Sequence, residues 1–214
     1  MKIQVLEKEI VGEIFTFTNR RAIFWKREKA LIISDVHIGK TAHFRKNGIA
    51  IPAGILEKDL NNLEQLFDHF EVQHVIIVGD LFHAGTNTDL DLFCEWRKQF
   101  SHLKMTLIKG NHDRIKKEFY CDNCIDLIEN KLQIAPFIFI HEPEIFDDQF
   151  CISGHIHPGI LVGNSKERIK LPCFSYSKNQ LILPAFSEFT GLDTKTLSKN
   201  FKTIAFSKDH IFEL

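Results

Sequence analysis

The sequence predicts an α/β fold in which mixed β-sheets are covered by helices. The middle of the chain alternates apolar strands with helical segments, and both ends are richer in strands. The 214 residues are enough for one domain with a substantial core, and 44% of them are hydrophobic. Five apolar strands also end in residues that bind metals. In open α/β sheets, ligands gather at the carboxyl ends of the strands.

Short apolar runs separated by turn residues predict the first strands. These strands are expected at 3–6, 14–17, 22–25 and 30–33. The N-terminal segment has no long apolar stretch of the signal-peptide type. No segment reaches the roughly 18 uninterrupted apolar residues that a membrane span needs.

Two helices are predicted in the middle of the chain, at about 54–70 and 89–100. In the first, Leu56, Leu60 and Leu63 recur at the three- and four-residue steps of a buried helix face. Longer apolar runs predict buried strands at 74–80, 104–110, 137–141 and 150–157. Further short strands are expected around 161, 169–173, 181–183 and 204–206.

The polar residues at the strand ends form a mixed oxygen and nitrogen set. They are Asp35, His37, Asp80, Asn111, His112, His141, His155 and His157. Such ligands are typical of a site for Mn²⁺, Fe²⁺, Zn²⁺ or a mixed pair of these ions, and less typical of a closed structural zinc site. Their number exceeds what one tetrahedral ion can use, which indicates two ions. In extended segments, residues i and i+2 point to the same side, so each D-x-H or H-x-H pair can face the site.

Each residue alone also has an ordinary explanation. A lone histidine is commonly a surface or hydrogen-bonded residue, and an aspartate after a strand commonly caps a turn or helix. Five strand ends in order, with these residue types, are not explained by coincidence. Gly79, Gly110 and Gly154 precede the ligands and permit sharp turns or close backbone approach.

Together, the short motifs that contain these residues resemble those of the calcineurin-like metallophosphoesterase superfamily. The motifs are Asp-x-His (35–37), Gly-Asp (79–80), Gly-Asn-His-Asp (110–113), His141 and Gly-His-x-His (154–157). The resemblance implies a four-layer α/β/β/α sandwich of two mixed sheets flanked by helices. It also implies that residues 1–214 form a single metallophosphoesterase domain with a binuclear metal centre.

The resemblance further implies a role for each residue. Seven residues would bind two divalent ions: Asp35, His37 and His157 the first, Asn111, His141 and His155 the second, and Asp80 both. His112 would be the catalytic histidine beside the ions. It would stabilise the developing charge or protonate the leaving oxygen. Two such ions can clamp a phosphoryl group and activate water at neutral pH.

A longer block, HIGKTAHFRKNGIAIPAG at 37–54, is similar to the ligase-associated metallophosphoesterases of bacteria, the PdeM group. Gly-Asp-Leu-Phe-His at 79–83 fits the same group. The similarity implies a manganese-dependent DNA endonuclease that prefers single strands and acts in DNA repair. It also implies functional association with a DNA ligase and a helicase. Fe or Zn stays open as the native metal, and a homodimer is possible.

Basic residues close to the ligands are expected to hold phosphates that flank the scissile one. They are Lys40, His43, Arg45 and Lys46. The alternative is a solvated basic loop. His83 could contact the scissile phosphate or leaving group, or equally cap the following loop. A second basic cluster, 20–29, could be a strand with one exposed face that contacts nucleic acid.

The net charge and the cysteine content exclude some classes of protein. The formal net charge of −1 excludes a protein that coats nucleic acid by charge alone. Five cysteines without a framework spacing favour a reducing cytoplasm, and the single C-x-x-C at 121–124 lacks the second pair of a structural zinc site. Two other functions compete with the nuclease. One is a small-molecule phosphodiesterase acting on cyclic or other nucleotides. The other is a scaffold that has lost catalysis, which would predict missing ligands.

Overall fold

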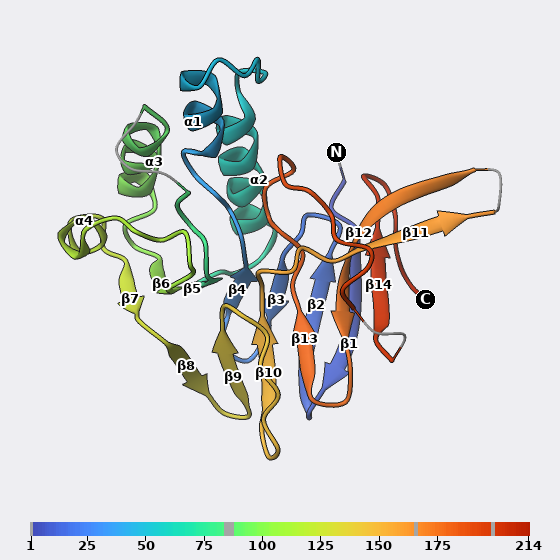
Figure 1. The fold of residues 1–214 in the computed structure, drawn as a ribbon. Helices are drawn as coiled ribbons and strands as arrows, with labels where there is room; N and C mark the ends of the chain where they lie inside the picture. The colour runs from blue at the N-terminus through green and yellow to red at the C-terminus, as the bar shows by residue number, and fades with distance from the viewer. Residues whose placement is uncertain (1, 84–87, 165–166, 198–199) are drawn as a thin grey trace.

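The structure is a computed structural model that describes residues 2–83, 88–164, 167–197 and 200–214 (Figure 1). Its first sheet has the spatial order β1-β2-β3-β4-β5-β6-β7. The strands are β1 (Val5–Ile10), β2 (Glu13–Thr18), β3 (Ile23–Trp25), β4 (Ala30–Ile33), β5 (His74–Val78), β6 (Lys104–Ile108) and β7 (Asp126–Ile128). Strands β1 to β4 pair antiparallel, and β4 to β7 pair parallel, so the sheet is mixed.

The second sheet has the order β15-β14-β12-β13-β10-β9-β8, with β11 paired to β12. The strands are β8 (Lys131–Ile134), β9 (Phe137–Ile140), β10 (Phe150–Ser153), β11 (Gly159–Gly163), β12 (Arg168–Tyr176), β13 (Gln180–Ile182), β14 (Lys202–Phe206) and β15 (Ile211–Glu213). Strands β9, β10 and β13 are parallel, and the others pair antiparallel. The β11–β12 hairpin projects away from the body of the molecule (Figure 1).

The helices cover the first sheet. They are α1 (Lys40–Lys46), α2 (Ile55–His69), α3 (Thr88–Gln99) and α4 (Lys117–Asp122). The leucines predicted to face the core, Leu56, Leu60 and Leu63, are buried against β4 and β5. The predicted α/β class, two mixed sheets flanked by helices, is confirmed. The helical cover lies on one side, because the described chain from β8 to β15 runs through strands and loops without a helix.

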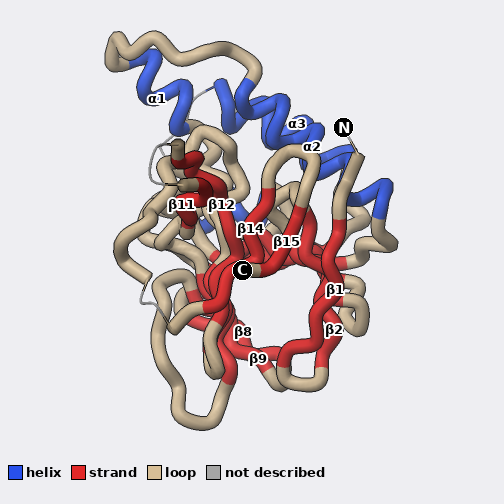
Figure 2. The backbone as a smooth tube through the Cα atoms, turned by 90° about the vertical axis from the view of Figure 1, so that its right-hand side faces the viewer, coloured by secondary structure: helices blue, strands red, loops and turns tan. Residues whose placement is uncertain are grey.

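Aromatic side chains fill the space between the two sheets, which face each other in Figure 2. Phe15 of β2 contacts Phe137 of β9 with ring centroids 5.1 Å apart. Phe17 packs edge to face on Phe174 of β12 at 5.0 Å. This core fixes one sheet against the other, and it therefore fixes the relative position of the loops at their ends.

Four strands end earlier than the sequence predicts. Strand β5 ends at Val78, β6 at Ile108, β9 at Ile140 and β10 at Ser153, so the predicted ligands lie in the loops beyond them. The loops after β4 and β5 are joined by backbone bonds from Asp35 to Gly79 and from His37 to Asp80. The amide of Phe186, in the loop after β13, donates to the carbonyl of Ser34 at 2.7 Å. Loops of both sheets thus meet at one edge. None of the described helices has the length and hydrophobicity that crossing a membrane requires.

Candidate metal centre

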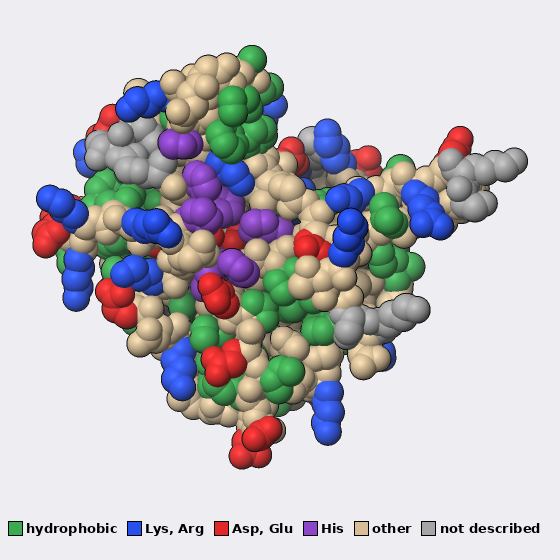
Figure 3. Space-filling view, in the orientation of Figure 1, with side chains coloured by type: hydrophobic (Ala, Val, Ile, Leu, Met, Phe, Trp, Pro, Cys, Tyr) green, Lys and Arg blue, Asp and Glu red, His purple; other side chains and the backbone are tan. Residues whose placement is uncertain are grey.

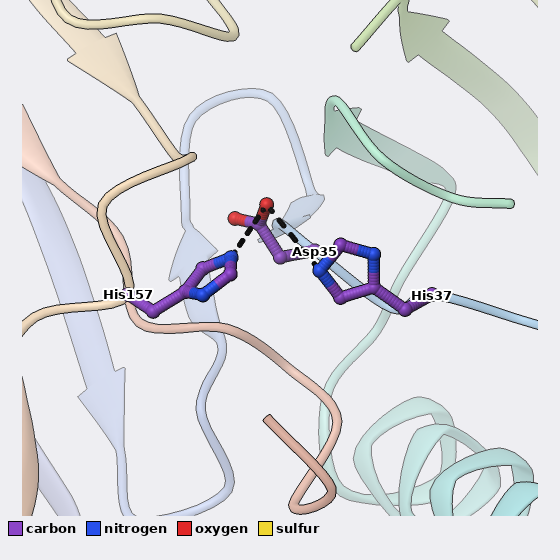
Figure 4. Close-up of side chains that lie close together, drawn as sticks. All are labelled: Asp35, His37 and His157. Carbon is purple, nitrogen blue, oxygen red and sulfur yellow. Dashed lines mark ion pairs between the residues drawn. The ribbon is translucent and has the colours of Figure 1, made fainter. Parts of the chain in front are cut away.

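A first group of donor atoms lies at the ends of β4 and β10. Asp35, His37 and His157 bring one ligand atom each to within 4.8 Å of one another (Figure 4). Oδ1 of Asp35 is 3.0 Å from Nε2 of His157 and 4.0 Å from Nε2 of His37. These three atoms are buried and make no hydrogen bond with the described residues. Buried polar atoms are rarely left without a partner, so their convergence fits a cation between them.

A second group converges on Nε2 of His141. Oδ2 of Asp80 lies 3.4 Å from it, Oδ1 of Asn111 lies at 3.0 Å and Nδ1 of His155 at 3.2 Å. Nδ1 of His141 faces the carbonyl of Val78 at 3.2 Å, which favours a proton on Nδ1 and leaves Nε2 as the atom that would bind an ion. Two oxygens and two ring nitrogens then face one point, and this donor set suits a divalent ion.

Five of the seven predicted ligands have a left-handed backbone. Asp35, His37, Asp80, His155 and His157 all have φ between 50° and 68°. Such φ values are uncommon for residues other than glycine and cluster at functional sites. The extended geometry expected for D-x-H and H-x-H was therefore wrong, although both side chains of each pair face the centre. The left-handed turns place Asp35 and His37 in one group, but they send His155 and His157 to different groups.

Burial and neighbouring charges set the protonation of these residues in the metal-free protein. Burial lowers the pKa of His37 to about 3. Burial also opposes charge on both His141 and Asp80, yet their mutual hydrogen bond and attraction hold the pKa of His141 at about 9 and that of Asp80 at about 2. In the metal-free protein, His141 and Asp80 of the second group therefore form an ion pair. The carboxylate of Asp80 thus stabilises a positive charge in this group.

Two glycines are required by close packing at the centre. A Cβ atom on Gly110 would collide with the backbone and carboxylate of Asp80, and one on Gly154 would collide with Ser34 and Asp35. Neither has a positive φ, so close approach, and not turn geometry, explains these two. Gly79 is required for both reasons: its φ is 84°, and a Cβ atom at this position would collide with the ring of His141.

His112 and His83 lie beside the two groups. The backbone amide of His112 donates to Oδ1 of Asp80 at 2.9 Å, and its ring lies 5.6 Å from that of His37. The rings of His83 and His112 are 4.5 Å apart, and burial lowers the pKa of His83 to about 4. Figure 3 shows the histidines gathered on one face of the molecule. His112 is half-buried.

The predicted phosphate-binding residues lie on α1, although no helix was predicted there. Lys40 is half-buried, and burial lowers its pKa while Asp35 and Asp80 oppose that shift. The ring of His43 is 6.3 Å from that of His83. Arg45 instead faces the buried Asp89, at 3.6 Å. Lys46 is exposed, so only Lys40 and His43 lie near the centre by these contacts.

The second basic cluster is engaged within the fold. Arg21 donates to the carbonyl of Ala185 at 2.8 Å, and burial lowers its pKa. Lys29 pairs with Glu71 at 3.0 Å. These contacts explain basic residues in this segment without a nucleic acid.

Sequence reasoning missed two supporting residues. Oγ of Ser34 donates to the carboxylate of Asp35 and lies 2.8 Å from the carbonyl of Val78. Asp113 is fully buried and accepts the amides of Phe82 at 2.8 Å and Gly110 at 2.9 Å. Burial raises the pKa of Asp113 to about 7. Both residues adjoin predicted site residues in the sequence, Asp35 and His112, but no pattern distinguishes them from turn residues.

Comparison with known proteins identifies relatives of this architecture. The calcineurin-like phosphoesterase family matches residues 29–157. The crystal structure of the nuclease MPE from Pseudomonas putida is 29% identical, with a TM-score of 0.85 over 99% of this chain and 100% of that chain.

Two further structures are much less similar. A protein of unknown function from Aquifex aeolicus is 17% identical, with a TM-score of 0.44 over 60% of this chain and 78% of that one. A Vps29 mutant from Entamoeba histolytica is 12% identical, with a TM-score of 0.38 over 86% and 96%. No curated protein matches the sequence.

Proposed function

Because the chain belongs to the calcineurin-like phosphoesterase family, whose members hydrolyse phosphoester bonds with divalent metal ions, we propose that it is a DNA endonuclease. The observation that carries this proposal is the convergence of two donor groups beside His112. The full-length similarity to a bacterial nuclease supports a nucleic-acid substrate. We further propose that single strands are preferred, that the metal is Mn²⁺, and that residues 1–214 act as a single domain.

Each residue has a role in this proposal. Two ions would be held by Asp35, His37 and His157 and by Asn111, His141 and His155, with Asp80 serving both. When bound, they would neutralise phosphate charge and lower the pKa of water. Asp80 interacts electrostatically with His37 as well as with His141, which supports its shared position.

The chain's own residues would complete the reaction. His112, anchored through its amide on Asp80, would deliver a proton to the leaving oxygen. Lys40 would bind a phosphate oxygen, because its ammonium group interacts electrostatically with Asp35 and Asp80 of the two donor groups. His83, whose ring lies 5.4 Å from that of His37 and 4.5 Å from that of His112, would orient the phosphodiester. His43, Arg45 and Lys46 stay predictions for the flanking phosphates.

The test compares two kinds of substrate. Wild-type protein with Mn²⁺ is incubated with circular single-stranded DNA, and His112→Ala is assayed in parallel. We expect the circle to be linearised, and we expect His112→Ala to lose about 10²–10⁴ in rate while it still binds metal. The exposed His102 provides a matched control variant, His102→Ala.

The competing function gives a different result. A phosphodiesterase for cyclic or other nucleotides would hydrolyse those small molecules and leave the DNA circle intact. A recess of about 380 Å³ beside Asn111 and His141 is the place where such a molecule would fit. Intact circles together with rapid nucleotide hydrolysis would overturn the nuclease proposal.

The biological setting is also a proposal. The five cysteines are all unpaired, which supports a reducing cytoplasm. A role in DNA repair, and association with a DNA ligase and a helicase, are supported by the sequence resemblance alone.

A further inference from the structure

Two phenylalanines stand beside the candidate centre without a role in the chemistry proposed above. Phe44 lies on α1 and Phe189 on the loop after β13, with ring centroids 6.1 Å apart in an edge-to-face arrangement. Phe44 lies 6.5 Å from the ring of His83, and His83 lies 5.4 Å from that of His37. A continuous line of rings therefore leads from the first donor group to this aromatic pair.

The pair is accessible, unlike most large aromatic residues of the chain. Phe44 and Phe189 are half-buried, whereas Phe15, Phe82 and Phe174 are fully buried in the core. Figure 3 shows hydrophobic side chains directly beside the histidines, at the level of α1 and the start of α2. Exposed aromatic surface next to a site that favours anionic substrates is suited to a ligand with both a phosphate and a flat ring.

The backbone on both sides of the pair is anchored. Oγ1 of Thr41 and the amide of Ala42 bond to Oδ2 of Asp89, at 2.9 and 3.2 Å. On the other side, the amide of Phe189 donates to Oγ of the buried Ser187 at 3.3 Å. A surface held in place before binding loses less conformational entropy when a ligand orders on it.

We propose that Phe44 and Phe189 form a stacking site for a nucleobase adjacent to the scissile phosphodiester. This inference rests on the proposed nuclease function and deepens it. Because every base has a π-face, stacking selects nucleic-acid strands over small phosphodiesters without reading sequence. Unpaired bases can leave the helical stack to reach such a surface, so the site also explains a preference for single strands. Lys40, on the same helix as Phe44, interacts electrostatically with Asp35 and Asp80 and adds positive charge beside the donor groups.

The experiment removes the rings and then the bases. The variants are Phe44→Leu, Phe189→Leu and the double variant. Phe44→Tyr keeps a ring at the first position. Phe146→Leu removes a half-buried ring that lies instead over Lys131 of β8. Thermal unfolding verifies that each variant is folded. Kinetics are measured on single-stranded DNA and on a small chromogenic phosphodiester.

For Phe44→Leu, Phe189→Leu and the double variant, we expect KM for DNA to rise about 10- to 100-fold, with a much smaller change for the small diester. Phe44→Tyr should restore most of the affinity, and Phe146→Leu should behave like the wild type. Equal losses on DNA and on the small diester would overturn the stacking site, because they would indicate a general disturbance of the centre.

Binding provides a test that does not depend on cleavage. Anisotropy is measured in the slow His112→Gln background with a fluorescent oligonucleotide and with the same oligonucleotide made abasic at its centre. The abasic strand should bind about 10-fold more weakly, and the double variant should abolish this difference. If no DNA is cut but base-dependent binding is lost in the double variant, the nuclease proposal fails and the stacking site stands. DNA that is cut with no effect of the bases would refute the stacking site alone.

Discussion

The two donor groups of the centre differ in their access to solvent. In the first group, Asp35 is fully buried, His37 is 5% exposed and His157 is half-buried. In the second, Asp80 and His141 are equally buried, but Asn111 and His155 are exposed. The second group also borders the recess of about 380 Å³ described above. The centre is therefore closed on one side and open on the other.

This difference in solvent access gives the two donor groups different expected roles. A buried cation site exchanges its ion slowly, because the ligands must move before water can enter. An exposed site retains positions for water and substrate, which is the arrangement that catalytic metal sites need. We therefore expect the first group to retain an ion and the second group to exchange its ion with solvent. The predictions below follow in order of their expected effect on phosphodiester hydrolysis.

The largest effect is expected from Asp80→Asn, which removes a carboxylate that interacts with both groups. Hydrolysis should fall by about 10³-fold or more, because neither group keeps its charge balance. Asp148→Asn, on an exposed loop, is the matched control and should retain wild-type kinetics. A fall of less than about tenfold for Asp80→Asn would mean that the carboxylate does not link the two groups.

A second pair of variants separates the groups. His157→Ala affects the closed group and Asn111→Ala the open one, and each should lower hydrolysis by at least about 100-fold, since loss even of outer partners of a metal costs 10- to 100-fold. Metal analysis after a short chelator treatment should find one retained ion per chain in wild type and in Asn111→Ala, but not in His157→Ala. Release of both ions in a single fast phase from the wild type would end the distinction between closed and open groups.

The sequence predicted which residues meet at this centre, because strand ends and residue types are local properties. Strand β4 and helices α2 and α3 were placed within one residue, since apolar runs and helical periodicity specify them. The left-handed turns at Asp35 and His155 were missed. Contacts between the assembled loops stabilise these φ values, and such contacts leave no periodic pattern in the sequence. Helix α1 was missed as well. It has few buried residues, and its anchor Asp89 comes from a distant segment.

Two buried serines offer a finer test of the closed group. Ser34 and Ser153 are both fully buried at strand ends, but only the hydroxyl of Ser34 bonds to a described residue, the carboxylate of Asp35. Ser34→Ala should lower metal affinity about 10- to 100-fold, because it releases a ligand's supporting partner. Ser153→Ala should leave affinity unchanged and should not lower the free energy of unfolding, since an unsatisfied polar group is removed. Isothermal titration with Mn²⁺ measures the first effect and urea unfolding the second. Equal affinities for both variants would contradict the support assigned to Ser34.

The smallest effect on hydrolysis is expected at Asp59 of α2, a buried carboxyl outside both donor groups. Burial raises its pKa from 3.8 to about 7, against the lowering effect of hydrogen bonds from Ser187 and Glu188. The folded protein therefore binds a proton that the unfolded chain releases near pH 4. The resulting stability is fully present below about pH 4 and is lost as the pH rises through about 7.

Asp59→Asn cannot lose a proton, so the variant should gain stability relative to the wild type as the pH rises from 4 to 8. The gain should amount to a few kcal/mol, because each pKa unit corresponds to about 1.4 kcal/mol. Urea unfolding at several pH values measures this difference, and hydrolysis at pH 7 should change by less than about twofold in the same variant. A stability difference independent of pH would mean that Asp59 is already ionised in the fold. Burial alone would then not separate it from Asp80, whose charge is stabilised by His141.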